Sequence, residues 1–264
     1  MPSLMGILNV TPDSFFDGGH YYSQNDAIAR AQKLIADGAD IIDIGGESTR
    51  PGAAPITIDE EIRRTVPAIS AIAKFGKPIS IDSRNAAVMA AACEAGARII
   101  NDVSALTHDA MALDIVKQFD AEIILMHMLG TPQTMQTNPT YENVVEQIYA
   151  YLAGRIDFCV RAGISAQKII IDPGIGFGKT ADHNTALIKN LTRFKSLGCR
   201  ILIGVSRKSF IAKLSHDEPP EQRLGGSLAA AMICAQNGAD ILRVHDVADT
   251  RQALILWHKL APIS

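Results

Sequence analysis

Polar and charged side chains recur at the end of almost every short apolar run in this sequence. The positions are Asn9, Asp43, Asp82, Asn101, Asp102, His127, Asp172, Ser206, Arg207, Lys208, Arg243 and His245. Each has an ordinary explanation on its own, because an Asp after a strand commonly caps the next helix and a lone His is commonly a hydrogen-bonded rim residue. Independent caps would not bring several cations and several carboxylate or amide acceptors to the ends of successive strands. The set as a whole therefore predicts one binding site.

One half of this set suits an anion. Arg50, Arg243 and His245 can bind a polyanion such as diphosphate through charged hydrogen bonds. Asn9 adds a neutral amide oxygen, a ligand that Mg²⁺ accepts while it keeps most of its waters and binds phosphate oxygens. We therefore expect a diphosphate with Mg²⁺ in this half of the site.

The other half suits a flat polar ring. A carboxylate such as Asp82 or Asp172 can accept two parallel N–H bonds from an amino-pyrimidine edge. The Asn101 amide supplies one donor and one acceptor, and the Lys208 ammonium can meet a ring oxygen or nitrogen. Together the two halves predict a ligand in which a diphosphate is attached to a polar heterocycle.

Two further segments follow late strands. IDPGIGFGK at 171–179 is rich in glycine but lacks the Lys-Ser or Lys-Thr ending of a Walker loop. We expect its backbone to bend away from a bound ring while Phe177 contacts a second aromatic partner. GVSRKSF at 204–210 predicts a helix N-terminus at Ser206, where free N–H groups would favour a carboxylate or a phosphate.

The elements that must position these side chains alternate along the whole chain. Short apolar runs predict strands at 4–9, 40–45, 77–82, 98–102, 122–127, 168–172, 200–206 and 240–245. Helical periodicity lies between them, as at 25–38, 144–163 and 226–238. Five glycines are placed where a left-handed residue would end a helix, namely Gly38, Gly96, Gly163, Gly198 and Gly238.

Eight strand–helix units with no linker between them predict a single α/β domain over residues 1–264, a closed (β/α)₈ TIM barrel. An open doubly wound sheet is the alternative, but no GxGxxG follows the first strand to support a dinucleotide site. In such barrels the active site lies at the C-terminal ends of the strands. The polar positions at the strand ends would then surround one mouth.

Composition excludes several classes of protein. With 264 residues, 47% hydrophobic and 20% charged, the chain reads as a globular enzyme, and a net charge of -3 gives no bulk attraction to nucleic acid or to an anionic membrane. Its longest apolar stretches, such as 227–235, fall short of the roughly 18 residues a membrane span needs, and no leader pattern opens the sequence. We expect a cytoplasmic protein whose four separated cysteines are buried thiols.

An ordered set of motifs resembles a known family. ILNVTPDSF, IDIGGESTRPGA, ISIDS, INDVS, ILMHMLGTPQTMQ, IIDPGIGFGK, GVSRKSF and RVHDV follow one another from the first strand to the last. Together they resemble the dihydropteroate synthases, folate-pathway transferases of the pterin-binding family that sulfonamides inhibit. The resemblance covers essentially the whole chain, and the ordered set is far more specific than any one motif.

This resemblance implies a reaction and a role for each matching residue. The reaction joins 6-hydroxymethyl-7,8-dihydropterin pyrophosphate to 4-aminobenzoate and releases pyrophosphate, with Mg²⁺. The implied pterin contacts are Asp82, Asn101, Met126, Asp172, Phe177 and Lys208. The implied pyrophosphate contacts are Asn9, which also binds the metal, Thr49, Arg243 and His245. The implied 4-aminobenzoate contacts are Thr49, Arg50, Pro51, Phe177, Ser206 and Lys208.

The resemblance also implies a mechanism and an assembly. Pyrophosphate would leave first, giving a pterin cation that Asp82 and Asp172 favour electrostatically. The loops after the first two strands would close over the site before this departure and so exclude water. The implied catalytic residues are Asp82, Asp172 and Lys208, with Phe15 and Asp17 of the first loop. A homodimer through helices near the C-terminal end of the chain is the expected assembly.

Three other functions compete with this one. A methyltetrahydrofolate-dependent corrinoid methyltransferase, also a pterin-binding barrel, would use Asp82, Asn101 and Asp172 but leaves Arg243 and His245 without a role. A Schiff-base aldolase would use Lys208 as its nucleophile, with Arg207 lowering the lysine pKa. A barrel kept only to bind a ligand would bind the pterin without turnover.

Overall fold

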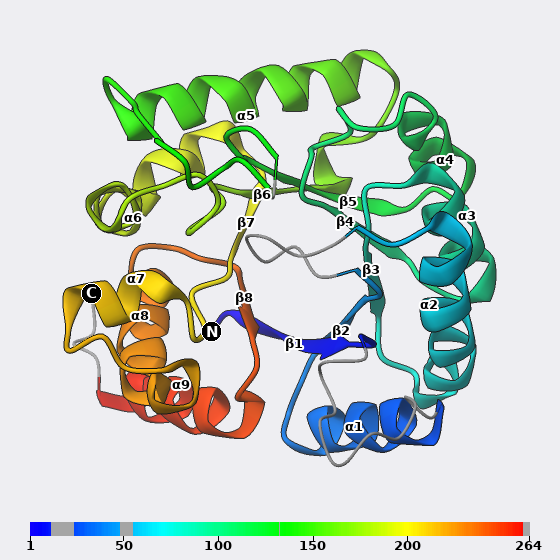
Figure 1. The fold of residues 1–264 in the computed structure, drawn as a ribbon, viewed down its shortest axis with the longest axis horizontal. Coiled ribbons are helices and arrows are strands. Elements are labelled where there is room, and N and C mark those ends of the chain that lie inside the picture. Colours follow the sequence, from blue (N-terminus) through cyan, green and yellow to red (C-terminus); the bar gives the residue numbers. More distant parts are fainter. Residues whose placement is uncertain (12–23, 48–54, 132, 261–264) are drawn as a thin grey trace.

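The strands close into one barrel. The computed structural model describes residues 1–11, 24–47, 55–131 and 133–260. Eight parallel strands pair in sequence order, and β8 pairs with β1 (Figure 1). They are β1 (Ser3–Asn9), β2 (Ile41–Gly45), β3 (Ile79–Asp82), β4 (Ile99–Asp102), β5 (Glu122–Met126), β6 (Ile169–Asp172), β7 (Arg200–Ile203) and β8 (Ile241–Val244). The barrel prediction is confirmed, and the open-sheet alternative is wrong.

Helices surround the barrel on its outer side (Figure 1). They are α1 (Gln24–Ala36), α2 (Ile58–Ile72), α3 (Ala86–Ala95), α4 (Ala112–Gln118), α5 (Val144–Arg161), α6 (Ala181–Lys189), α7 (Ser209–Leu214), α8 (Leu224–Gln236) and α9 (Val247–Leu260). Short 3₁₀ turns lie at Ala73–Phe75, Ala166–Lys168, Leu191–Leu197 and Pro220–Gln222. The five glycines expected after helices all have positive φ, as predicted.

Alternation along each strand divides the core into two parts. Outward residues such as Ile42, Ile44 and Ile81 belong to the large cluster under the helices. Inward residues form a separate apolar layer inside the barrel, made of Met5, Ile41, Ile99, Ile124, Ile170, Leu202 and Ile241. This layer forms the floor of the space at the mouth of the barrel.

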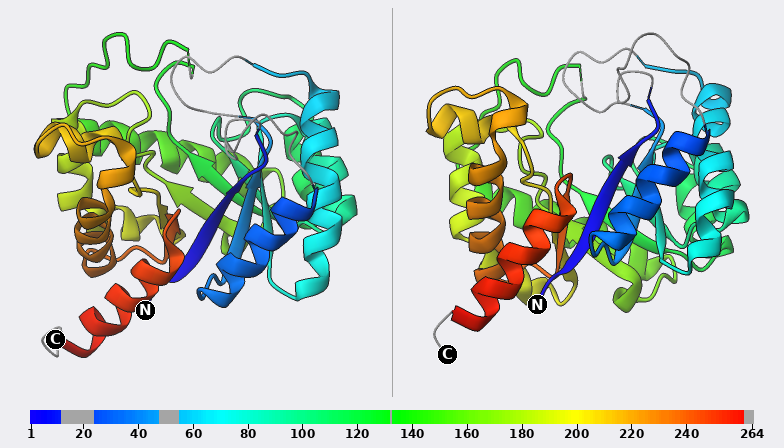
Figure 2. Two further views of the ribbon diagram at one scale, coloured as in Figure 1. Left: turned by 60° about the horizontal axis from the view of Figure 1, so that its bottom comes forward. Right: turned by 90° about the horizontal axis from the view of Figure 1, so that it is seen from below.

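Further along the strands, most of the inward positions are polar, the exceptions being Ile7, Met126 and Gly204. These inward positions are Ile7, Asp43, Ser80, Asn101, Met126, Asp172, Gly204 and Arg243. Because a period of two keeps them on the same side as the floor residues, they point into the barrel. In Figure 2, β1 runs from the N-terminus at the lower end of the barrel toward this mouth.

Two smaller predictions can be compared with the structure. All four cysteines are buried and free, as expected. Among the helices that the structure describes, none combines the length and the apolar character needed to cross a bilayer.

Candidate functional site

The structure brings most of the predicted site residues to the mouth. Asn9, Asp82, Met126 and Asp172 end their strands, and Asn101 lies one residue before the end of β4. The others lie in the last strand or in loops after strands, namely Phe177, Ser206, Lys208, Arg243 and His245. The predictions made for Phe15, Asp17, Thr49, Arg50 and Pro51 lie outside the described residues.

Arg243 bridges two carboxylates inside the barrel. Its Nε lies 2.6 Å from Oδ2 of Asp43 and its Nη2 lies 2.7 Å from Oδ2 of Asp82. The Asn101 amide makes longer contacts with the two Asp43 oxygens, at 3.3 and 3.5 Å. Burial alone would lower the pKa of Arg243, but the two carboxylates raise it, so the guanidinium is charged. The residue expected to bind diphosphate therefore also neutralises the base of the pocket.

Asp82 ends β3 and is less deeply buried than Asp43, with side-chain exposures of 10% and 0%. Burial raises its pKa above the usual range, and the Arg243 charge opposes that rise. Asp43 is fully buried and, although it ends no strand, it faces the same space as Asp82. The two acids and Arg243 form a set of acceptors and donors suited to the edge of a polar ring.

Asp172 and Lys208 face each other on the opposite side of the mouth. Burial raises the pKa of Asp172, while the charge of Lys208 and the bond from the Gly174 N–H at 2.7 Å lower it. Burial likewise lowers the pKa of Lys208 to about 8, opposed by Asp172. The Lys208 Nζ donates to the Ile175 carbonyl and lies 4.6 Å from the centre of the Phe177 ring. Three predicted ligand contacts thus converge here.

The glycine-rich loop after β6 is held by donors from several elements. The carbonyls of residues 174 to 178 accept, in order, from Phe177 N, Lys208 Nζ, Gln136 Nε2, Lys179 Nζ and Tyr141 Oη. At Gly174, φ is +72° and a Cβ would lie 2.0 Å from the His127 carbonyl oxygen. The loop after β6 therefore packs backbone to backbone against the loop after β5, and glycine is required for that approach.

Ser206 and His245 pair across the last two strand ends. The Ser206 Oγ lies 3.0 Å from His245 Nδ1 and accepts from the His245 N–H at 3.2 Å. The helix expected to begin at Ser206 begins instead at Ser209, with Lys208 as its N-cap residue. Arg207, at φ +57°, forms the intervening turn and donates through Nε to Asp246 at 2.9 Å. That placement contradicts the predicted helix start but leaves Ser206 beside His245.

His127 and Asp102 have the ordinary roles that the sequence allowed. Burial, with the nearby Lys179 charge, lowers the pKa of His127 to about 3, so the ring is neutral. Its Nδ1 lies 3.1 Å from Lys179 Nζ. Asp102 accepts from the backbone N–H groups of Ser104 and Leu106 and so caps its own loop. Neither side chain needs a ligand to satisfy it.

Sequence reasoning gave no specific contact to three buried polar residues of the mouth, although it placed Asp43 among the polar positions at the strand ends. Asp43 and Ser80 lie inside strands, and the period-two pattern alone would have turned both inward. The Ser80 Oγ has no hydrogen-bond partner among the described residues. Lys179 is only 3% exposed, and nothing in the local sequence marks it as buried.

A metal at this mouth would depend mainly on its substrate for ligands. Within the described ranges, no cluster of three His, Cys, Asp or Glu side chains could hold a metal ion. Asn9 offers a single half-buried amide at the rim. This donor set fits Mg²⁺ coordinated chiefly by phosphate oxygens and water, which is how that ion commonly binds.

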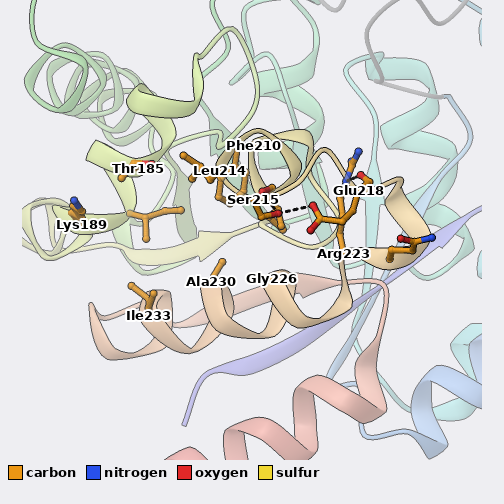
Figure 3. A pocket seen from close by; sticks show the side chains of 13 residues that line it. Thr185, Lys189, Phe210, Leu214, Ser215, Glu218, Arg223, Gly226, Ala230 and Ile233 are labelled. Carbon is orange, nitrogen blue, oxygen red and sulfur yellow. Dashed lines mark hydrogen bonds between the residues drawn. The ribbon is translucent and has the colours of Figure 1, made fainter.

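A separate groove lies on the outside of the barrel, away from these residues. It encloses about 430 Å³ between α6, α7 and α8, with a mainly apolar lining (Figure 3). Leu214 and Ile233 on its border are 55% and 47% exposed. The groove has none of the charged groups of the mouth, so it is not a second substrate site of the same kind.

Comparisons with known proteins agree on one family. Residues 5–245 match the family model described as pterin binding enzyme. The chain is 46% identical over 262 residues to the dihydropteroate synthase of Haemophilus influenzae, covering 99% of this chain and 94% of that protein.

Solved structures give the same result. The dihydropteroate synthase of Xanthomonas albilineans with 4-aminobenzoic acid superposes with a TM-score of 0.93 at 44% identity, covering 100% of this chain and 94% of that one. The same protein with 7,8-dihydropteroate gives 0.90 at 42% identity, with 100% and 95% covered. The Yersinia pestis enzyme in a sulfonamide complex gives 0.93 at 43% identity, with 98% and 94% covered.

Proposed function

The chain belongs to the pterin-binding enzyme family as a homologue of the dihydropteroate synthases over nearly its whole length, and we propose that it catalyses their reaction. It joins 6-hydroxymethyl-7,8-dihydropterin pyrophosphate to 4-aminobenzoate, giving 7,8-dihydropteroate and pyrophosphate in folate biosynthesis. The observation that carries the proposal is the buried mouth itself, where Asp82, Asn101 and Asp172 stand beside Lys208 and Arg243. A related structure with a sulfonamide bound makes this chain a candidate sulfonamide target as well.

The pterin occupies the polar layer of the barrel. Asp172 and Asp82 accept N–H bonds from its amino-pyrimidine edge, and the Asn101 amide pairs with a ring donor and acceptor. Lys208 meets a ring oxygen or nitrogen, and Met126 and Phe177 contact the ring faces. Burial of both acids supports these roles, because buried carboxylates need hydrogen-bond donors and a bound pterin supplies them.

The pyrophosphate lies nearer the opening. Arg243 and His245 bind it together with Thr49, and Asn9 contributes one oxygen to Mg²⁺ that arrives on the phosphates. Bound Mg²⁺ supplies charge stabilisation for the departing pyrophosphate. His245 is held for this task by Ser206, whose hydroxyl contacts both its ring and its backbone N–H. Asp43 anchors the Arg243 guanidinium through its Nε, at 2.6 Å.

The charges of the site suit departure of pyrophosphate before attack by the amine. The C–O bond to pyrophosphate breaks, and the remaining pterin methylene cation lies among Asp43, Asp82 and Asp172. The amine of 4-aminobenzoate then forms the new C–N bond and loses one proton. Arg50, Pro51, Phe177, Ser206 and Lys208 surround the aminobenzoate, and Phe15 and Asp17 of the first loop complete the site.

The whole chain, residues 1–264, acts as one domain, since all eight strands contribute to one barrel and one mouth. It works as a homodimer in which α7 and α8 meet their copies, a role supported by the exposed apolar groove there. The cytoplasm is the proposed compartment, because its reducing conditions keep buried thiols free.

A direct assay tests the reaction. Purified protein given the pterin pyrophosphate, 4-aminobenzoate and Mg²⁺ should release pyrophosphate and form dihydropteroate, and omission of either organic substrate should stop product formation. Absence of product with both substrates present would refute the proposal. Pterin binding without turnover would instead support a binding-only barrel, and borohydride trapping of a carbonyl compound on Lys208 would support an aldolase.

A further inference from the structure

Two neighbouring loops of the mouth are joined by more than surface contact. The loop after β5 and the glycine-rich loop after β6 approach so closely that a Cβ at Gly178 would lie 2.6 Å from the Leu129 Cβ. Gln136 and Tyr141, both from the segment after β5, donate to carbonyls of the glycine-rich loop at 2.6 and 2.9 Å. The position of Phe177, at the centre of that loop, therefore depends on contacts with the loop before it.

Lys179 lies at the junction of the two loops. Its Nζ is 2.9 Å from the Phe177 carbonyl, 3.3 Å from the His127 carbonyl and 3.1 Å from His127 Nδ1. Because the His127 ring is neutral, Nδ1 can accept a hydrogen bond and the ring proton resides on Nε2. An ammonium has three N–H donors, so these three acceptors satisfy it fully.

A cation at this point also has an electrostatic effect. Burial lowers the pKa of Lys179 to about 7, and the charge of Asp172 opposes that fall. In its protonated form, which prevails below that pH, Lys179 favours the ionised form of Asp172. The other groups facing Asp172 are Lys208, Arg243 and the buried thiol of Cys234. Lys208 is expected to meet the ligand, whereas the three described contacts of Lys179 are all to the protein.

We propose that Lys179 is a positioning residue of the pterin site. Its buried amino group fastens the loop after β5 to the glycine-rich loop, which positions Phe177, and its charge when protonated favours ionised Asp172. This inference rests on the proposed function, because it assigns to the loops the task of holding a pterin. A neutral side chain could join the two loops by hydrogen bonds but could not favour the ionised form of Asp172. This explains why a lysine occupies a site with so little exposure.

The main test replaces Lys179 by a side chain of similar length without donors or charge. In Lys179→Met, the KM for the pterin pyrophosphate should rise about tenfold or more, corresponding to roughly 1.4 kcal/mol, while the KM for 4-aminobenzoate changes much less. The acidic limb of the pH profile of kcat/KM should move to higher pH, because Asp172 loses a neighbouring positive charge.

Two matched variants separate charge from packing. Lys117→Met changes an exposed lysine of α4 and should leave both KM values and the pH profile unaltered. Tyr141→Phe removes a neutral donor to the same glycine-rich loop, so it should raise the pterin KM without moving the acidic limb. A folded Lys179→Met with unchanged pterin KM and an unmoved limb overturns the proposal, even if its melting temperature falls.

The proposal stays testable if Lys179→Met does not fold. Lys179→Gln keeps two N–H donors without the charge, so the acidic limb of its pH profile should move as in Lys179→Met while its pterin KM rises less. In the unmodified protein, ¹⁵N-detected lysine NMR should find a slowly exchanging ammonium for Lys179, and exchange as fast as that of Lys117 overturns the assigned contacts. An inactive wild type would refute the proposed function, whereas an active wild type with an unaffected Lys179→Met refutes only the positioning role.

Discussion

Lys208 shows how a side chain suited to a ligand can cost the unliganded protein stability. Its ammonium lies in a buried mouth where a single carboxylate, Asp172, opposes the burial that lowers the lysine pKa to about 8. In the unfolded chain the same group would titrate near its ordinary value of about 10.4. The folded protein therefore binds this proton less tightly than the unfolded chain does, and that difference disfavours folding at neutral pH.

Removing this ammonium should therefore stabilise the protein at pH 7. We expect Lys208→Met to raise the free energy of unfolding by roughly 1 to 3 kcal/mol at that pH. Between about pH 8 and 10.4 the unfolded wild-type chain binds more protons at Lys208 than the folded protein does, so wild-type stability should rise with pH. The difference in free energy of unfolding between Lys208→Met and wild type should therefore shrink across that window. Urea unfolding of both proteins at pH 7 and about pH 10 measures it.

An exposed lysine of the same helix provides the control. Lys213→Met, in the last turn of α7, should show no stabilisation at pH 7 and no change in the difference across the same pH window. A wild type at least as stable as Lys208→Met at pH 7 would contradict the expected destabilisation by Lys208.

Residues at strand ends were predictable, whereas residues fixed by contacts between loops were not. Asp82 and Asp172 end apolar runs, so their place at the mouth follows from barrel geometry alone. Asp43 was included among the polar positions but given no specific contact, because it lies in the middle of a strand, where only the period-two rule shows which way it points. Lys179 could not be assigned, because its acceptors include atoms of residue 127, distant in sequence and brought near only by the paired β5 and β6.

At the scale of elements, the loop after β6 depends on glycine for its shape. Gly174→Ala should lower the free energy of unfolding by at least about 2 to 3 kcal/mol. About 1 to 2 kcal/mol comes from a positive φ, and the rest from the overlap between the new Cβ and the His127 carbonyl. Because that overlap separates the loops that hold Phe177, pterin affinity should fall as well. Chemical unfolding and calorimetry with the pterin measure the two effects.

The control for Gly174 is a glycine with a similar backbone and no close neighbour. Gly163 has φ +95°, and a Cβ added there would meet no atom of the described residues within 4 Å. Gly163→Ala should therefore show the conformational cost alone and leave pterin binding intact. Equal loss of stability in the two variants would mean that the close approach of the loops contributes nothing.

Several strands that form continuous apolar runs were predicted almost to the residue, whereas the end of the seventh strand and the start of α7 were not. The strand expected at 40–45 is found at Ile41–Gly45 and that expected at 98–102 at Ile99–Asp102. The strand expected at 200–206 stops at Ile203, because its last three residues turn away to place Ser206 beside His245. Helix α7 spans only six residues, too few for helical periodicity to locate its start.

At the scale of the molecule, the closed barrel separates binding from assembly. The inward layer of the strands forms the mouth, while the outer face of the barrel is covered by helices whose own outer sides remain available. Since the groove between α6, α7 and α8 lies on that outer side, a second copy can cover it without entering the mouth (Figure 3). A dimer formed there would leave substrate access unchanged.

A charge placed in this groove should therefore break the proposed dimer and leave the pterin site unchanged. Ile233 on α8 is 47% exposed and borders the groove, and a buried apolar contact at the centre of an interface is commonly worth about 2 kcal/mol or more. Ile233→Glu should raise the dissociation constant of the dimer at least thirtyfold, as measured by sedimentation velocity. Its pterin affinity should stay within about twofold of wild type. Leu256→Glu alters a similarly exposed leucine on α9, outside the groove, and should still sediment as a dimer. If Leu256→Glu dissociates the dimer and Ile233→Glu does not, the interface lies on α9 instead. A wild type that sediments as a monomer would refute the dimer.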